Sequence, residues 1–376
     1  MSRLPLALLL LALYGAAYAQ APSAPAEASG ETAADGAVTV MEYEPRSTLV
    51  VPETRVTRAA VPFVDAHAHL WRAATMSAGA LDTLVAEMDA MNMAVMVNLS
   101  GGSGERLRAA IANTERHAPG RIVHFANVDF DGIGTPGWGE RAARQLREDV
   151  GAGARGLKIY KSLGLTLTDA DGARVPVDDP RIAPVWDAAG DLGVPVLIHS
   201  ADPAPFWEPY DRHNERYYEL TERPRRRQRP PPSFEEVIAE QHRVFARHPG
   251  TSFIAAHLGW FGSDLARLGE VLDAHPNVVT ELGAVLAEIG RQPRTARAWL
   301  IRYQDRVLMG KDSYAPEEYH VYFRVLETRD DYIEYYRRRH ANWRLYGLGL
   351  PPEVLEKVYA ANARRVIPGL DAGAFE

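Results

Sequence analysis

One pattern limits the fold of this chain more than any other. From residue 59 onward, short apolar runs alternate with longer segments whose apolar residues recur at helical spacing, as in Leu81, Leu84, Val85, Met88 and Met91. We predict strands at residues 62–67, 94–99, 122–128, 155–160, 195–199, 252–257, 278–282 and 307–310. Strands that are apolar throughout are typical of a parallel sheet covered by helices. Eight such units predict an α/β fold, a single-domain (β/α)8 TIM barrel over residues 59–370.

The predicted helices are residues 105–117, 140–149, 182–192, 234–248, 265–274, 295–303 and 352–366. Two connections, 201–233 and 313–350, are longer than the others and follow the carboxyl ends of strands, where such barrels bind ligands. We therefore interpret both as candidate lids. Their aromatic residues either cover an organic substrate or pack against each other or a second subunit. The arginines within residues 223–229 favour a solvated loop over a polyanion site, because flanking prolines keep the segment extended.

The first 19 residues have the layout of a secretory signal peptide. Arg3 precedes an apolar run over residues 4–13, and Ala17-Tyr18-Ala19 forms a small-x-small cleavage site. The apolar run is too short to anchor the protein in a bilayer. Residues 20–37 are rich in Ala, Pro, Ser and Gly and predict a disordered linker, and residues 38–58 an extended lead-in. We expect an exported protein, periplasmic or secreted, without a membrane anchor after cleavage.

Composition limits which partners this chain can bind and which residues could bind a metal. Hydrophobic residues make up 46% of the chain and charged residues 24%, as in soluble globular proteins. The formal charge is -7, and removal of Arg3 makes it more negative, which disfavours a nucleic-acid partner and favours a small-molecule substrate. The chain has no cysteine, so any metal must be held by histidine, carboxylate or a modified lysine.

Polar side chains end several of the predicted strands. His67 and His69 are two residues apart and so share a face of the first strand, and Asp65 lies on the same face. His199, His257 and Asp312 end three other strands. A single residue of this kind is more often a hydrogen-bonded core side chain or a helix cap. Several buried together without a shared partner would cost several kcal/mol, so the set indicates one divalent cation.

The motifs carrying these residues resemble, in their order along the chain, those of the amidohydrolase superfamily. They are His67-Ala68-His69, Ile198-His199-Ser200, Ala256-His257-Leu258-Gly259, Gly310-Lys311-Asp312-Ser313 and, on the last helix, Asn362-Ala363-Arg364-Arg365. The chain is most similar to the amidohydrolase-related branch, which includes metal-dependent hydrolases and the aminocarboxymuconate-semialdehyde decarboxylase type. The resemblance covers residues 59–370.

This resemblance implies a metal centre and its ligands. His67, His69, His199 and Asp312 would bind the metal, and His257 would lie beside it as an acid or base. Three imidazoles and a carboxylate suit one Zn(II) ion with a further position open. Asp312 could also take a proton from water, and His257 could give one to a leaving group, so both are catalytic candidates. The sequence leaves their division of labour open.

Lys158 has three alternative roles. Alternation along its strand turns Lys158 and Tyr160 into the barrel. Some superfamily members carboxylate a lysine on this strand to bridge a second metal; otherwise Lys158 anchors an anionic substrate or forms a structural ion pair. We take Lys158, Tyr160 and Trp71 as substrate-binding candidates. We treat Lys311 as structural, with its side chain pointing away from the metal.

Other polar residues lie at the ends of predicted strands. Glu281, Asn98 and Ser100 either contact the substrate or are ordinary polar residues of the barrel rim. A homo-oligomer is expected from the resemblance, because members of this branch are often oligomeric, and the number of subunits is left open.

Four functions compete. The first is a metal-dependent hydrolase of an amide, ester or lactone, and the second a non-oxidative decarboxylase of the same branch. A ligand-binding barrel without catalysis is disfavoured because all five polar positions, His67, His69, His199, His257 and Asp312, are retained. A nuclease is disfavoured by the negative charge. An exported location favours hydrolysis.

Overall fold

The structure, a computed structural model, describes residues 37–39, 42–370 and 372–375. The predicted signal peptide and most of the predicted linker lie outside the described residues. By its internal contacts the chain divides into two units. The first unit ends at Thr48, and the second begins at Leu49. In the first unit the described residues form no helix or strand, and the Thr39 hydroxyl donates to the Glu42 carboxylate at 2.7 Å. The rest of the lead-in, to residue 58, is also free of helix and strand.

The described residues of the second unit contain nine short strand segments in two parallel sheets, with the first three segments in one sheet and the other six in the second, and within each sheet the segments pair in chain order. They are β1 (Phe63–Ala68), β2 (Met93–Asn98), β3 (Ile122–His124), β4 (Ala126–Asn127), β5 (Leu157–Ile159), β6 (Val196–Ile198), β7 (Phe253–Ala255), β8 (Val278–Glu281) and β9 (Val307–Leu308). The third predicted strand is thus divided into β3 and β4: the Phe125 amide still donates to Asn98 of β2, whereas the Ala126 amide donates to Gly156 beside β5.

A hydrogen bond from the Ala66 amide to the Met309 carbonyl, 2.9 Å long, joins the first strand to the end of the last. Parallel pairing in chain order, together with this closing bond, fits a (β/α)8 barrel. In such a barrel the carboxyl ends of all strands meet at one rim, so residues far apart in sequence come together there.

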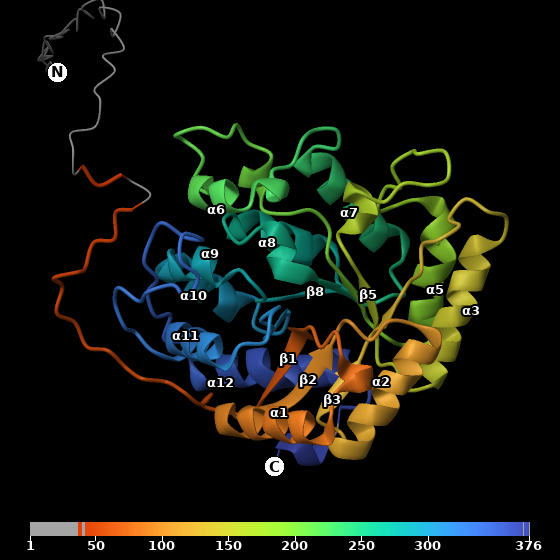
Figure 1. Ribbon diagram of the computed structural model, residues 1–376, viewed down its shortest axis with the longest axis horizontal. Helices are drawn as coiled ribbons and strands as arrows, with labels where there is room; N and C mark the ends of the chain where they lie inside the picture. Colours follow the sequence, from red (N-terminus) through yellow and green to blue (C-terminus); the bar gives the residue numbers. More distant parts are fainter. Residues whose placement is uncertain (1–36, 40–41, 371, 376) are drawn as a thin grey trace, which may run out of the picture. The chain divides into compact units, whose positions relative to one another are not determined.

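Helices surround the strands of this unit (Figure 1). They are α1 (Ala78–Met91), α2 (Gly104–His117), α3 (Trp138–Gly151), α4 (Ser162–Leu165), α5 (Ala183–Asp191), α6 (Tyr217–Glu222), α7 (Phe234–Arg247), α8 (Leu265–Ala274), α9 (Leu286–Gly290), α10 (Pro293–Arg302), α11 (Pro316–Glu327), α12 (Pro352–Glu356) and α13 (Asn362–Val366). Local sequence sets their ends. Ser233 and Glu236 form a capping box at the start of α7, and Asn92, with φ 70°, ends α1 in the left-handed conformation.

The apolar residues form two layers that follow the alternation of side chains along each strand. Leu157 and Ile159 belong to the layer that packs against the helices. Leu197, Ile254 and Leu308 belong to a separate, smaller cluster, which α13 closes with Ala363. The strand residues therefore alternate between the two layers.

The segment 313–350 differs from the expected lid. It contains the twelve-residue helix α11, on which Tyr319, Tyr322 and Phe323 are fully buried. The rings of Phe63 and Phe323 lie 5.4 Å apart, so these aromatic residues pack against strand β1 in the core. Of the three alternatives for the aromatic residues, packing within the protein holds for these residues of α11.

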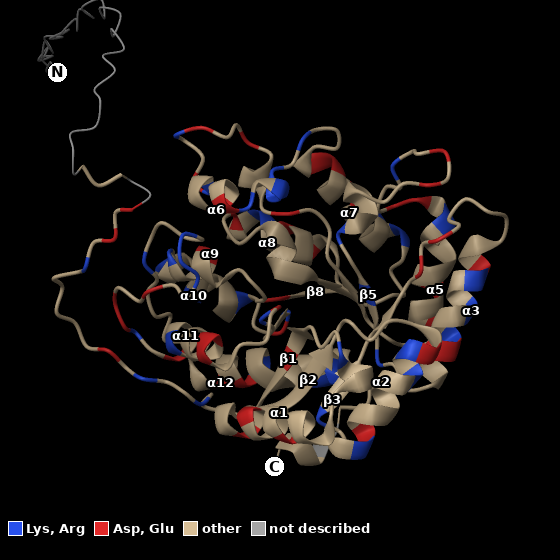
Figure 2. Ribbon diagram, viewed as in Figure 1, with Lys and Arg blue, Asp and Glu red and all other residues tan. Residues whose placement is uncertain are grey.

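None of the described helices is both long and apolar enough to cross a bilayer. Acidic and basic residues lie side by side on α2 and α3 in the view of Figure 2.

In the 223–229 segment, Arg226 pairs with Glu219 and Arg227 lies over the Tyr210 ring at 3.3 Å. Arg226 and Arg227 of this segment thus contact other residues of the protein.

Candidate metal centre

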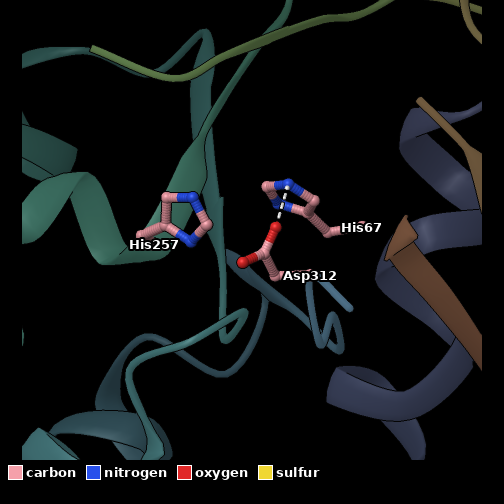
Figure 3. A group of neighbouring side chains, drawn as sticks. All are labelled: His67, His257 and Asp312. Carbon is pink, nitrogen blue, oxygen red and sulfur yellow. Dashed lines mark ion pairs between the residues drawn. The ribbon is translucent and has the colours of Figure 1, made fainter. Parts of the chain in front are cut away.

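The polar residues predicted at the strand ends come together at one rim of the strands. His67 lies in β1, His199 directly follows β6, His257 follows β7, and Asp312 follows β9. Nε2 of His67 and Nε2 of His69 each lie 3.5 Å from Oδ1 of Asp312. Figure 3 shows two imidazoles, His67 and His257, and the Asp312 carboxylate gathered around a common space.

The nitrogen and oxygen atoms that His67, His257 and Asp312 could offer to a metal lie within 4.8 Å of one another. His257 was expected beside the metal, and the structure places it inside the group. His199 joins through its Nδ1, which is 3.3 Å from His257 Nε2. Lys158 is buried in the same place, with its Nζ 3.4 Å from His67 Nε2.

Hydrogen bonds to Nδ1 assign the tautomers of three histidines. His67 Nδ1 donates to Glu281 at 2.9 Å, and His257 Nδ1 donates to the Gly283 carbonyl at 2.7 Å. A carbonyl oxygen can only accept, so the ring proton of His257 must lie on Nδ1. Each Nε2 therefore keeps its lone pair, as a metal ligand requires.

The third tautomer follows from a chain of hydroxyl groups. Tyr160 donates its proton to the Leu99 carbonyl at 2.9 Å, so its oxygen accepts from Ser100, 3.1 Å away. The Ser100 oxygen then accepts from Nδ1 of His69 at 2.6 Å. His69 is left with a free Nε2 lone pair that faces Asp312.

His257 and Asp312 leave their strands in unusual backbone conformations, with φ of 59° and 84°. Side chains other than glycine rarely adopt the left-handed region, and each such residue costs on the order of 1–3 kcal/mol. A bond from the Asp312 amide to the His67 carbonyl, 2.6 Å long, holds the second of these turns. Strain of this kind gathers at functional sites, and here it aims both side chains at the group.

Burial keeps the imidazoles of His67, His199 and His257 neutral. It lowers the pKa of His67 and of His199 well below the usual range, and nearby positive charge lowers both further. Burial and the neighbouring His67 lower the pKa of His257 to about 4. Burial also lowers the pKa of Lys158 to about 8, partly opposed by Asp312 and Glu281.

Asp312 is ionised. Burial raises the pKa of this carboxyl, but its contacts with His69 and the other imidazoles lower the pKa more and hold it well below its usual range. A carboxylate oxygen therefore faces several nitrogen lone pairs.

These residues fit a divalent cation. Lone pairs of His67 and His69 face an anionic oxygen at 3.5 Å, an arrangement that repels unless a positive charge lies between them. In addition, Nε2 of His199 is buried and has no hydrogen-bond partner among the described residues. Histidine nitrogens and a carboxylate are ligands that zinc accepts. His67, His69, His199 and Asp312 would hold the ion, and a ring nitrogen of His257 lies within 4.8 Å of the atoms that His67 and Asp312 would offer.

Aromatic rings line both sides of this group. Trp71, 61% exposed, stacks on His69 with ring centroids 5.3 Å apart and an angle of 8°, and Tyr160 stacks beside it. On the other side Trp260 stacks on His257 at 4.5 Å. Trp260 also lines a cavity of about 360 Å³ next to segment 201–233 and α9. A cavity of this size suits a small organic molecule.

Two residues named from the sequence have structural contacts instead of ligand positions. Asp65 accepts from the His67 amide at 3.0 Å and the Lys311 amide at 3.1 Å, so it joins β1 to the end of β9. Tyr319 donates to the same carboxylate at 2.5 Å. The ammonium of Lys311 pairs with Glu318, on α11.

Sequence reasoning gave no specific role to Glu281, Ser100 or Trp260. Glu281, the last residue of β8, is fully buried and bonds to His67. Ser100 bonds to His69. The position of Glu281 and Ser100 at strand ends was visible in the sequence, but their histidine partners were not.

Comparison with known proteins identifies the family. Residues 64–369 match the amidohydrolase family, whereas no curated protein matches the chain. Among solved structures, the fold is similar to 2,6-dihydroxybenzoate decarboxylase from Rhizobium, with 16% identity, 81% of this chain and 98% of that chain covered and a TM-score of 0.52. It is also similar to 4-oxalomesaconate hydratase from Rhodopseudomonas palustris, with 14% identity, coverage of 83% and 97% and a TM-score of 0.50.

At these identities the two structures show a shared fold. The sequence match is the stronger result, because it begins one residue into β1, spans the other strands and includes the residues from His67 to Asp312. It confirms the resemblance seen in the motifs: this chain belongs to the amidohydrolase family, whose members are metal-dependent enzymes.

Proposed function

We propose that this enzyme is a metal-dependent hydrolase that cleaves an amide, ester or lactone bond in a small anionic organic substrate. The observation that carries the proposal is the set of free Nε2 lone pairs facing the ionised Asp312. When bound, a divalent cation, which we propose to be one Zn(II), supplies Lewis acidity to a carbonyl group and to a water molecule.

The chain's own residues would move the protons. Asp312 accepts a proton from the attacking water, since it is ionised within the group. The Nδ1 proton of His257 is engaged by Gly283, so Nε2 of His257 can take the water proton from Asp312 and deliver it to the leaving group. The substrate carbonyl gains the oxygen of water, and the amine or alcohol leaves with the proton.

Substrate binding would use the residues beside this group. Trp71 and Tyr160 offer a stacked wall for a planar part of the substrate. The buried ammonium of Lys158 offers a positive charge to a carboxylate or other anionic group. Carboxylation of Lys158 to hold a second metal is the alternative; elemental analysis that finds two equivalents, lost in Lys158→Arg, would favour it.

A decarboxylase of the same branch is the second candidate, because a cation at Lys158 beside the metal group could bind a carboxylate that departs as CO2. His257, after taking up a proton from water at Nε2, would then protonate the carbon left behind. Incubation with a panel of esters, lactones and aromatic acids in water labelled with a heavy oxygen isotope separates the two. Label in the product supports hydrolysis, and CO2 release without label refutes it.

Metal content tests both candidates. We expect about one equivalent of zinc or a similar ion in the purified protein. His199→Ala and Asp312→Ala should lose the metal, whereas His257→Ala should keep it and lose turnover. A protein that carries no metal and gains no activity on reconstitution would refute the proposal, and full activity of His257→Ala would refute the role of that residue.

We also infer export from the sequence of the first 19 residues. Mature protein that begins at Gln20 in the periplasm or medium would support export, and a cytoplasmic protein that begins at Met1 would contradict it.

A further inference from the structure

We propose that Glu281, at the end of β8, is a positioning residue that orients His67 for metal binding and holds His257 beside the metal group. The inference rests on the proposed metal centre and adds to it a residue that touches neither metal nor substrate. Glu281 is fully buried, so its carboxylate serves only groups of the protein itself.

Both carboxylate oxygens of Glu281 are used at the site. Oε1 accepts from Nδ1 of His67 at 2.9 Å and from the backbone amide of His257 at 2.6 Å. Oε2 accepts from the backbone amide of Gly283. One side chain on β8 therefore binds a histidine of β1 and the second residue after β7.

These bonds have different consequences for the two histidines. Because Oε1 of Glu281 accepts from Nδ1 of His67, the ring proton stays on Nδ1 and the Nε2 lone pair points toward Asp312. The bond to the His257 amide holds that residue in its left-handed conformation, with φ 59°. Without Glu281 the His67 ring would be free to change tautomer and rotate, and His257 would lose a bond that sustains its strained backbone.

Two glycines leave the space that the carboxylate occupies. A Cβ atom at Gly283 would lie 2.6 Å from Oε2, and one at Gly310 would collide with the same oxygen and lie 3.1 Å from the Cβ of His67. The ends of β8 and β9 thus lack side chains where Glu281 needs room. This packing is independent of the hydrogen bonds and points to the same role.

Glu281→Ala and Glu281→Gln provide the test, with Thr280→Val as the matched control. Thr280 is the preceding residue of β8, equally buried, and donates to the Ala255 carbonyl at 2.7 Å without touching a histidine. Zinc dissociation constants are measured by competition with a chelator, and the visible spectrum of the Co(II)-loaded protein reports the geometry of the ligands. Thermal unfolding of each metal-free protein shows whether it folds.

We expect Glu281→Ala to bind zinc about 10–100-fold more weakly and to change the Co(II) spectrum, whereas Thr280→Val loses stability but keeps zinc affinity. Glu281→Gln keeps an oxygen for His67 but turns an amide toward the Gly283 amide, so it should rescue most of the affinity in a less stable protein. If Glu281→Ala does not fold, Gly310→Ala replaces it: the added methyl displaces the intact carboxylate and should also weaken zinc binding.

Two results would overturn the inference. One is a folded Glu281→Ala protein, or Gly310→Ala in its place, that binds zinc within about twofold of wild type. The other is an equal loss of affinity in Thr280→Val, which would reduce Glu281 to a general packing role. If the wild-type protein binds no metal, the proposed function fails first and this inference with it, so the two failures are distinguishable.

Discussion

His124 should make the stability of this protein depend on pH in a way that one substitution removes. The residue lies in β3, 2% exposed, between two neutral partners. Asn98 donates to its Nδ1 at 3.1 Å, and its Nε2 proton is directed at Thr114 Oγ1, 2.9 Å away. Burial lowers the pKa of His124 from 6.5 to about 4. Protonation would break the bond from Asn98, because both nitrogens would then be donors.

The sign and size of this pH dependence of stability follow from the linkage between protonation of His124 and folding. Between these two pKa values the unfolded chain binds more protons at His124 than the folded chain, so stability falls as the pH falls below 6.5. At about pH 5 the unfolded state gains on the order of 2 kcal/mol from this residue alone, and close to nothing at about pH 7.5.

Urea unfolding at these two pH values, for wild type and His124→Gln, measures the effect. Glutamine does not titrate, so the variant should lose about 2 kcal/mol less between the two conditions, whatever its stability at neutral pH. His242 and His340, whose pKa values burial also lowers, are present in both proteins and cancel in the comparison. Equal losses in the two proteins would refute the reasoning.

Two further predictions concern the candidate site. Ser100→Ala removes the acceptor for His69 Nδ1 and should weaken zinc binding about 10–100-fold. Tyr160→Phe leaves that bond in place and should weaken zinc binding less. Competition with a chelator measures both affinities, and a larger loss in Tyr160→Phe would contradict the proposed order of donors. Trp71→Ala removes an exposed stacking surface worth about 0.5–1.5 kcal/mol, so KM should rise by up to about tenfold. Zinc content and the unfolding transition should stay unchanged. An unaltered KM would exclude Trp71 from substrate binding.

Much of the fold and of the candidate site could be predicted because both depend on local patterns. Apolar runs and helical spacing record which faces of each element are buried. Parallel strands bring their carboxyl ends to one rim, so polar residues at the ends of several strands had to converge. That reasoning placed His67, His69, His199, His257 and Asp312 together, and the contacts between them in the structure agree.

Other features were decided only by packing between distant parts of the chain. The partner of His67 is Glu281, 214 positions away, and no local pattern distinguishes this carboxylate from a solvated one. The free nitrogen of His257 depends on which atom faces a carbonyl at residue 283. For the tyrosines of α11, the sequence left open whether they cover a substrate or pack within the protein. The tertiary structure buries Tyr319 and Tyr322 and places Tyr319 beside Phe63. The sequence by itself determined which residues meet at the rim, since strand direction and period are local. Only the tertiary structure decided how each one is oriented, because hydrogen bonds and burial belong to pairs of residues that the fold brings together.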